Sequence, residues 1–539
     1  MSLSQSFSQK IGNVRPLNPC PSLDIDFANG GYVNTGGFAN QASVGSANFK
    51  IGAFNGPDPI FTRATAATFR GSDGLIQYAP ENLIPNSESF DAGTWTKGNL
   101  NITGTPSWIN VATAPNGLNV ADCIFANSTL SSHYIRYVGL SGIQSNPVTF
   151  SVFLKKNGYD LAMVSVQSLT SNFEQFRIYA NLLTGSYSST AFGGAVFITA
   201  SVDDVGNGWF RCSVTGSLGT KGDPTPSVSI LESSGAISFS GDPTKGIYIW
   251  GAQLERSSTA RPYISTTALP VYGPRFEYDL SGNPLGLLME EQSQNLVYPS
   301  STLTTQTRTV TAAPHTLSFY GTGSVSLSGA TIGTVIGSGA NTRTVYTFTP
   351  TAGSLTLTVS GSVTLAQLEQ KPFATSYIPT VGGPMTRNAD VVNSTIGSWF
   401  NADEGTIVVK GDRTGFNIQD SLFEFTSGTT ASLAHRGDGT DENFLVEDAA
   451  TTVTIVETIP LNSPLYFAAS YSALATQVNA TVNAEPVQGT SLASTITTPT
   501  TLNIAYSPEI STYFNGHIKA FRYYAKALPS KLEFFTLTT

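Results

Sequence analysis

One phrase occurs twice in this chain and limits the fold more than any other feature. Residues 250–270 read "WGAQLERSSTARPYISTTALP", and residues 364–384 read "TLAQLEQKPFATSYIPTVGGP". We call these segments the closing phrases, because a phrase repeated in an otherwise varied chain is expected to close two separate folded modules. Leu254, Tyr263 and Ile264 are interpreted as core residues that lock the last strand of a module to the first. At a spacing of 114 positions the two phrases share Ala252/Ala366, Gln253/Gln367, Leu254/Leu368, Glu255/Glu369, Ala260/Ala374, Tyr263/Tyr377, Ile264/Ile378, Thr266/Thr380 and Pro270/Pro384.

A second pair of related segments precedes the modules. Residues 61–87 read "FTRATAATFRGSDGLIQYAPENLIPNS", and residues 274–300 read "PRFEYDLSGNPLGLLMEEQSQNLVYPS". Each contains two extended runs around a Gly-containing turn, which is the pattern of a β-hairpin. Each also ends on an Asn-Leu pair, Asn82-Leu83 in the first and Asn295-Leu296 in the second.

The spacing of these phrases divides the chain. A chain of 539 residues exceeds the size of a single core. We predict an irregular N-terminal arm over residues 1–60, a first hairpin with a jelly-roll-like sandwich over 61–270, a second hairpin with a smaller sandwich over 271–384, and a further sandwich over 385–539. The segment "LPSKLEFFTL", with Ser530 as an N-cap, predicts a short terminal helix.

Composition favours an all-β fold of tandem antiparallel β-sandwiches. Only 12% of the residues are charged, while 40% are hydrophobic, and short apolar alternations are separated by Gly-rich turns. The net charge of −9 and the lack of a basic stripe argue against nucleic acid as a partner. No apolar run is long enough for a membrane span. Cys20, Cys123 and Cys212 lie far apart and indicate neither a disulfide framework nor a zinc site.

The chemistry expected of an enzyme is not visible in the sequence. The four histidines, His133, His315, His435 and His517, stand in separate contexts, and no nucleophile elbow, zinc motif or phosphate loop is present. Carboxylate pairs that could cleave a glycan occur at Asp24/Asp26, Asp203/Asp204 and Glu290/Glu291, each with a structural alternative. We therefore expect no catalysis and no cofactor.

Two sets of residues are weak candidates for binding. Asp438, Asp441 and Glu442 lie together in "HRGDGTDEN", where oxygen ligands on a Gly-rich loop suit calcium, although a solvated loop explains them equally. Trp95, Trp108 and Trp399 lie near turns and could stack on sugar rings, with core packing as the alternative. Trp209 and Trp250 lie inside apolar strands and are interpreted as core residues.

Several of these phrases resemble bacteriophage virion proteins of the fibre and spike type. In that group, similar phrases surround jelly rolls like those of carbohydrate-binding modules. "EGTIVV" and "GHIKAFRYYAKAL" near the C-terminus are similar to a laminin-G or concanavalin-A-like sandwich. The matching positions are Thr62-Arg63-Ala64, Asp73-Gly74, Pro274-Arg275-Phe276 with Asp279, Leu285-Gly286-Leu287-Leu288 with Glu290-Glu291, and both closing phrases.

The resemblance implies a structural protein on the virion surface that binds bacterial surface glycans. It also implies attachment to other virion proteins, through the arm of residues 1–60, and a homo-oligomer, with a trimer favoured. Two alternatives stay open. The first is a capsid or tail decoration or connector protein that binds no glycan, and the second is a tailspike that depolymerises glycan. The sequence does not distinguish tail from head attachment.

Overall fold

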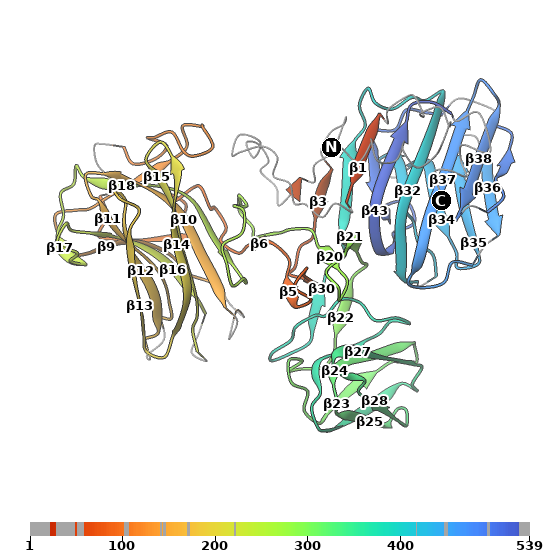
Figure 1. Ribbon diagram of the computed structural model, residues 1–539, viewed down its shortest axis with the longest axis horizontal. Coiled ribbons are helices and arrows are strands. Elements are labelled where there is room, and N and C mark those ends of the chain that lie inside the picture. Colours follow the sequence, from red (N-terminus) through yellow and green to blue (C-terminus); the bar gives the residue numbers. More distant parts are fainter. Residues whose placement is uncertain are drawn as a thin grey trace.

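The computed structural model describes residues 22–27, 49–50, 59–101, 107–140, 143, 147–169, 173–219, 223–416, 418–428, 430–446, 451–456, 458–483, 485–492 and 496–527. Within these residues every regular element is a strand, and the strands form three lobes (Figure 1). The prediction of an all-β chain built from antiparallel sandwiches is confirmed. No helix in the described part of the chain is long and apolar enough to cross a membrane. The helix expected at Ser530 lies outside the described residues.

The first sandwich packs two sheets around one hydrophobic cluster. Their strand orders are β14-β15-β10-β18-β8 and β13-β12-β11-β16-β9-β17, with β7 beside β9. The bounds of the first sheet are β8 (Asp122–Phe125), β10 (Val148–Asn157), β14 (Val196–Gly206), β15 (Trp209–Ser217) and β18 (Gly246–Glu255). Those of the second are β7 (Trp95–Gly98), β9 (Leu130–Tyr137), β11 (Leu161–Gln167), β12 (Gln175–Asn181), β13 (Tyr187–Phe192), β16 (Thr225–Leu231) and β17 (Ser238–Ser240).

The second sandwich is smaller and has its own hydrophobic cluster. Its strand orders are β23-β28-β25-β26 and β27-β24-β29. The bounds are β23 (Gln306–Val310), β24 (His315–Gly321), β25 (Ser324–Gly329), β26 (Gly333–Ile336), β27 (Gly339–Phe348), β28 (Gly353–Ser360) and β29 (Thr364–Glu369).

The third sandwich contains strands from four distant parts of the chain. Its first sheet has the order β20-β21-β43-β32-β37-β38-β39 with β1 beside β43, and its second has the order β2-β3-β31-β40-β33-β34-β35-β36. The first sheet comprises β1 (Leu23–Asp26), β20 (Phe276–Tyr278), β21 (Pro284–Met289), β32 (Glu404–Gly415), β37 (Ser463–Ser472), β38 (Gln477–Val482), β39 (Gln488–Thr490) and β43 (Asn515–Tyr524). The second comprises β2 (Phe49–Lys50), β3 (Ile60–Thr62), β31 (Val391–Thr395), β33 (Phe423–Ser427), β34 (Thr430–Gly437), β35 (Asp441–Val446), β36 (Thr451–Val456) and β40 (Thr501–Ile504).

Four short strand pairs complete the described fold. They are β4 (Thr68–Arg70) with β5 (Ile76–Tyr78), β6 (Glu81–Asn82) with β19 (Val271–Tyr272), β22 (Ser293–Asn295) with β30 (Met385–Arg387), and β41 (Tyr506–Ser507) with β42 (Thr512–Tyr513).

The segment 1–60 is not simply an irregular arm. In Figure 1 the red strand β1 lies among the blue strands of the third sandwich, and Ile25 pairs in register with Phe521 of β43. Alternation in "LDIDF" places Leu23, Ile25 and Phe27 in the core of the third sandwich. The alternation of Asp24 and Asp26 is visible in the sequence, but the partner strand lies almost 500 residues away.

The two predicted hairpins exist, but each also joins the third sandwich. β4 pairs with β5, and β20 pairs with β21. β21 then pairs with β43, and β3, which precedes the first hairpin, pairs with β31. We expected residues 61–80 and 271–289 to belong to the sandwiches that follow them. Instead β3, β20 and β21 extend the sheets of the third sandwich, while β4 and β5 form a separate two-stranded sheet and β19 pairs with β6.

We expect Ile25→Ala to destabilise the third sandwich by about 2–5 kcal/mol, the usual cost of deleting a fully buried aliphatic side chain. Hydrogen exchange on peptides that cover β43 measures this loss locally. Asp24→Ala is the matched control, since Asp24 forms a partly exposed ion pair with Arg522 that should contribute about 0–1 kcal/mol. Equal exchange in both variants would show that β1 does not stabilise its neighbour.

The closing phrases perform the same task in the first and second sandwiches. Leu254, Tyr263 and Ile264 are buried, as expected for core residues, and so are their counterparts in the second phrase. Gln253 accepts a hydrogen bond from the Ile264 amide at 2.7 Å, and Gln367 accepts one from the Ile378 amide at 2.6 Å. A buried glutamine therefore joins the last strand to the extended segment that follows it in each module.

The Asn-Leu pairs complete the same closure from the start of each module. The side chain of Asn82 donates to the carbonyl groups of Ala252 and Ile264. Asn295 donates to Ala366 and Ile378 in the same way. Both asparagines are fully buried and also accept hydrogen bonds from two backbone amides. The repeated sequence is therefore a hydrogen-bonded clasp that fastens the first and last segments of a sandwich.

Candidate functional site

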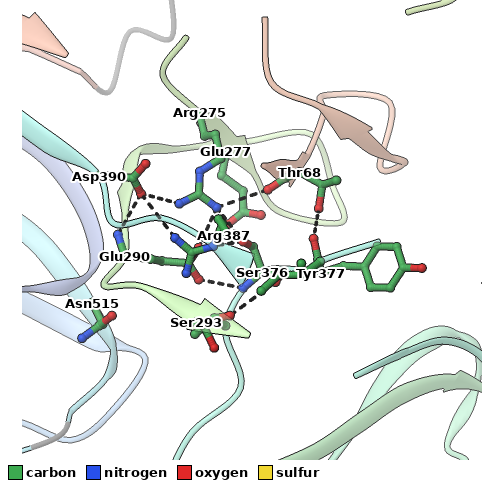
Figure 2. A network of polar contacts seen from close by, with 12 residues as sticks. Thr68, Arg275, Glu277, Glu290, Ser293, Ser376, Tyr377, Arg387, Asp390 and Asn515 are labelled. Atoms are coloured by element: carbon green, nitrogen blue, oxygen red, sulfur yellow. Dashed lines mark hydrogen bonds and ion pairs between the residues drawn. The ribbon is translucent and has the colours of Figure 1, made fainter. Parts of the chain in front are cut away.

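A buried ion network lies where the second and third sandwiches meet the two hairpins (Figure 2). Arg275 donates from Nη1 to Glu290 at 2.6 Å and also pairs with Asp390. Asp390 in turn accepts from Arg63 Nη1 at 2.7 Å. Arg387 Nη2 lies 3.3 Å from Glu290. Three guanidinium groups and two carboxylates are thus assembled from the first hairpin, the second hairpin and the segment before β31.

The network fixes the protonation of its members. Burial alone would raise the pKa of Glu290, but Arg387 and Arg275 hold it well below its usual range. Burial lowers the pKa of Arg63 to about 10, against the opposing effect of Asp390. The amide and hydroxyl groups of Ser376 both donate to Glu290 at 2.6 Å. Glu290 is therefore charged in the folded protein. Its hydrogen bonds from Ser376, a residue of the second closing phrase, connect the second sandwich to the second hairpin.

A cleft of about 600 Å³ lies beside this network. Thr68, Ser376 and Tyr377 belong to its wall, and Thr68 donates to the backbone carbonyl of Tyr377 across the junction (Figure 2). The remaining wall combines aromatic, amide and charged side chains from the hairpins and the second and third sandwiches. They are Phe69, Arg70, Ile76, Glu277, Tyr278, Asp279, Leu280, Ser281, Leu285, Tyr320, Asn341, Thr342, Arg343, Thr414, Asn462 and His517.

Two arginines give the cleft its hydrogen-bond donors. Arg70 donates to the hydroxyl group of Tyr320 at 3.0 Å and to the Gly74 carbonyl at 2.7 Å. Arg343 donates from Nη2 to Ser318 at 2.8 Å. Its Nε is buried and has no hydrogen-bond partner in the described part of the chain. Because a buried donor without a partner is costly, this atom marks a place where a bound polar group would be stabilised.

His517 lies at the base of the cleft between two carboxylates. Its Nδ1 is 2.7 Å from Asp412, and its Nε2 is 2.8 Å from Glu277. Burial alone would lower the pKa of His517, but the hydrogen bonds to Asp412 and Glu277 raise it to about 9. Lys519 also contacts Asp412 at 3.3 Å. With both ring nitrogens donating, His517 is an imidazolium that links β20 to β43, and it is unavailable as a general base.

We expect the stability of this junction to fall as the pH rises from about 6.5 to about 9. The folded state binds its proton more tightly than the unfolded chain, so the stabilisation is complete below about pH 6.5 and is lost above pH 9. The limiting slope for one group is about 1.4 kcal/mol per pH unit. Urea unfolding between pH 6 and 9.5 measures it, and His517→Gln should remove this part of the slope. An unchanged slope in the variant would contradict the assignment.

The cleft can bind but is poorly arranged for acid–base chemistry. Its histidine is paired at both nitrogens, and the carboxylate of Asp279 accepts hydrogen bonds from its own turn at Ser281 and Asn283. What remains are arginine donors, tyrosine rings and amide side chains that converge on one space. Such a mixture suits a polar ligand with several hydroxyl or carbonyl groups.

The tryptophan candidates lie in the hydrophobic cores. Trp95 and Trp108 pack in the cluster of the first sandwich, and Trp399 packs in that of the third. Their exposed fractions are 3%, 7% and 8%. None of the three presents an open ring face for a sugar. Each lies near a turn in the sequence, but its side chain packs in a hydrophobic core. Trp209 and Trp250 are buried as expected.

The calcium candidates do not converge. Asp438 is exposed and accepts hydrogen bonds from Thr440 and Asp441 in its own turn. Glu442 faces the interior, as the alternation of β35 requires, and lies 2.9 Å from both Arg413 and His435. Sequence proximity therefore misled this prediction, because neighbouring residues of a strand point to opposite faces.

Glu442 instead belongs to a buried cluster with Asp420 and His435. Arg413 occupies the middle of this cluster and donates from Nε to Asp420 at 2.7 Å. The Leu422 amide donates to Nδ1 of His435, and Nε2 lies 2.9 Å from Glu442. The guanidinium of Arg413 already pairs with both carboxylates and lies where a metal ion would have to bind, so the geometry fits an ion network of the third sandwich rather than a metal centre.

The remaining carboxylate pairs have local partners. Asp203 accepts from the Ser201 hydroxyl, and Asp204 accepts from the Gly206 amide. Glu291 forms an ion pair with Lys371 at 2.8 Å. None of the pairs noted in the sequence lines the cleft.

The residues that do line the cleft were not identified as a site from the sequence. Glu277 belongs to the phrase "PRFEYD", and Arg70 belongs to the first hairpin, so both lie inside segments that the sequence marks. Nothing in the local pattern indicates that Arg343 and His517 face the same space. Their placement on one cleft depends on how the second and third sandwiches lie relative to each other.

By its fold the chain belongs to the class of multi-sandwich all-β proteins. No protein-family model and no curated protein matches it. Among solved structures, it is similar to the CBM40 module of the Ruminococcus gnavus IT-sialidase bound to α2,3 sialyllactose. That match has 16% identity and a TM-score of 0.23, and covers 26% of this chain and 83% of that chain.

A second similar structure is that of domains LG4-5 of the mouse laminin α1 chain. This match has 9% identity and a TM-score of 0.21, and covers 80% of this chain and 97% of that chain. A third, the LG1-3 region of the laminin α2 chain, has 9% identity and a TM-score of 0.18, and covers 74% of this chain and 96% of that chain. All of these scores are low, so the function proposed below depends on the geometry of this chain.

Proposed function

We propose that this protein is a non-catalytic glycan-binding structural protein and that the junction cleft is its binding site. The observation that carries the proposal is a cleft of about 600 Å³ in which Arg70, Arg343 and Tyr320 converge, with one buried arginine donor unused. Saccharides present many hydroxyl groups around apolar ring faces. Arginine and amide donors bind the hydroxyl groups, and tyrosine rings contact the ring faces.

The rigidity of the cleft supports a binding role. Its wall is fixed by the ion network, the Thr68–Tyr377 hydrogen bond and the His517 pairings, so little side-chain freedom is lost when a ligand binds. A single cleft of this kind is expected to bind a saccharide weakly. Several copies on one particle would raise the apparent affinity through effective concentration.

Arg343→Gln should weaken binding of bacterial surface polysaccharide by about tenfold or more, because a charge-assisted hydrogen bond contributes about 1.5–3 kcal/mol. Biolayer interferometry with immobilised polysaccharide and the purified full chain measures the change. Lys245→Gln, an exposed charge in the first sandwich, is the matched control. Wild-type binding by the Arg343 variant, or no binding by the wild type, would exclude the cleft as the glycan site.

We further propose that the chain is a virion fibre or spike protein and forms a homo-oligomer, with a trimer favoured. The support is the resemblance of its phrases to that group. Residues 1–21 precede β1, so their deletion retains every described strand of the third sandwich. If they attach the protein to particles, the truncated chain should be absent from purified virions. Light scattering measures the oligomer directly.

The two alternatives make different predictions. A decoration or connector protein would remain on virions yet bind no host polysaccharide. A depolymerising tailspike would release new reducing ends when incubated with the polysaccharide. We expect no such release, because the cleft carboxylates Glu277 and Asp279 are held by His517 and by the hairpin turn, and the carboxylate pairs noted in the sequence do not line the cleft.

A further inference from the structure

The outer face of one sheet in the first sandwich carries a second array of polar and aromatic side chains. In β11, Ala162, Val164 and Val166 belong to the hydrophobic core. Because side chains alternate along a strand, Met163 and Ser165 point to the opposite face. The same alternation holds in the three neighbouring strands. We call the following set the Tyr-Arg face: Tyr134 and Arg136 of β9, Ser227 and Ser229 of β16, Met163 and Ser165 of β11, and Arg177 and Tyr179 of β12.

Strand register orders these residues into two rows. In the first row Arg136 pairs with Ser227, Ser227 with Ser165, and Ser165 with Arg177. In the second row Tyr134 pairs with Ser229, Ser229 with Met163, and Met163 with Tyr179. The face thus has an arginine and a tyrosine on each side, with three serines and Met163 between them. Three strand spacings separate the two arginines, or about 14 Å between Cα atoms.

Aromatic rings position both guanidinium groups. Arg136 lies over the ring of Tyr134 at 5.0 Å, and Arg177 lies 5.0 Å from the ring of Tyr179 and 4.3 Å from that of Phe192. The Tyr134 ring in turn covers Gly98 of β7, where an added Cβ would meet the ring at 2.2 Å. Each arginine is therefore held on the face by a stacked ring.

The polar groups of this face are only partly used. The Nε atoms of Arg136 and Arg177 and the hydroxyl group of Ser165 are buried and have no hydrogen-bond partner within the described residues. Neither arginine forms an ion pair in that part of the chain, and neither row contains a carboxylate. Two guanidinium groups thus stand without counter-charges around an unsatisfied hydroxyl group. Unsatisfied buried donors of this kind are rare in folded proteins and indicate an absent partner.

We propose that the Tyr-Arg face binds an acidic polysaccharide, with carboxylate or sulfate groups on the two partly exposed arginines at its two sides. A guanidinium binds such groups through paired, charge-assisted hydrogen bonds. The separation of the arginines is too large for one carboxylate to bridge, so the ligand carries at least two negative charges. This face lies in a different module from the cleft, and the inference does not depend on the function proposed above.

The test uses the full chain and pairs of polysaccharides that differ only in charge. Polygalacturonate, alginate and other carboxylated polysaccharides are each compared with their carboxyl-reduced forms by affinity electrophoresis. We expect binding to at least one acidic member and at least tenfold weaker binding to its reduced form. Arg136→Gln and Arg177→Gln should each weaken that binding about tenfold, as expected for loss of one charge-assisted contact. Higher salt should weaken it further.

Three further variants distinguish charge recognition on this face from binding elsewhere on the chain. Thr96→Glu places a carboxylate opposite Arg136 on the neighbouring strand and should weaken acidic binding, whereas Thr96→Gln should not. Lys156→Gln removes an exposed charge elsewhere in the module and should have no effect. The preference should persist in Arg343→Gln, so failure of the cleft and failure of this face are distinguishable. Equal binding of acidic and reduced polysaccharides, wild-type binding by both arginine variants, or no binding to any acidic member would each overturn the proposal.

Discussion

Asp390→Ala is expected to lower the free energy of unfolding by about 3–5 kcal/mol, the typical result of removing one partner from a buried ion pair. Asp390 is 1% exposed and faces Arg63 and Arg275, whose guanidinium groups are themselves buried. Its removal would leave three buried positive charges against Glu290 alone. The neighbouring hydrogen bond from the Glu290 amide to Asp390 would also be lost.

Chemical unfolding combined with hydrogen exchange across 274–300 and 385–395 measures this effect. Asp279→Ala in the turn of the second hairpin is the control, because that carboxylate is exposed and serves only its own turn. We expect the control to remain close to the wild type. A loss below about 1 kcal/mol for Asp390→Ala would mean that water or side-chain rearrangement compensates the arginines.

Asn82→Ala and Asn295→Ala should each destabilise their own sandwich by about 3–5 kcal/mol, because each leaves two carbonyl groups and two amides buried without a partner. The two variants should act separately. Asn82→Ala should speed exchange in β18, and Asn295→Ala should speed it in β29. Gln294→Ala is the control, since that neighbouring side chain is exposed and, among the described residues, bonds to Thr386 alone. Loss of both sandwiches in either variant would refute the view that each clasp closes one module.

The sequence predicted where the modules close, because the residues that close a module lie in one short segment and that segment occurs twice. Gln253, Tyr263 and Ile264 recur at one spacing, and the hydrogen bonds of Gln253 and Tyr263 lie within the same module, although the Ile264 side chain packs in the cluster of the third sandwich. Most strands of the first sandwich were predictable for the same reason, since the alternation of "VTFSVFLKK" is complete within β10. The role of Asn82 and Asn295 was not predictable in detail, although their repetition marked them.

What the sequence did not predict depends on distant pairing or on side-chain direction. β1 pairs with β43, and nothing in the sequence near residue 23 indicates which strand its partner is. Arg343 and His517 meet across two sandwiches. The tryptophans and the acidic triplet around Asp438 show the other cause, since closeness in sequence does not say which face of a strand a residue occupies. Identifying the Tyr-Arg face required the pairing register between strands as well as the alternation of side chains along each strand.

The position of β43 has a consequence for the newly made chain. This strand, residues 515–524, is the shared neighbour of β1, β21 and β32, which precede it by more than 100 residues. The first two sandwiches are contiguous segments that lie between β1 and β32, so on the ribosome each can finish folding while the third still lacks its central strand. Until residues 515–524 have been made, the edges of β1, β21 and β32 that pair with β43 have no partner strand.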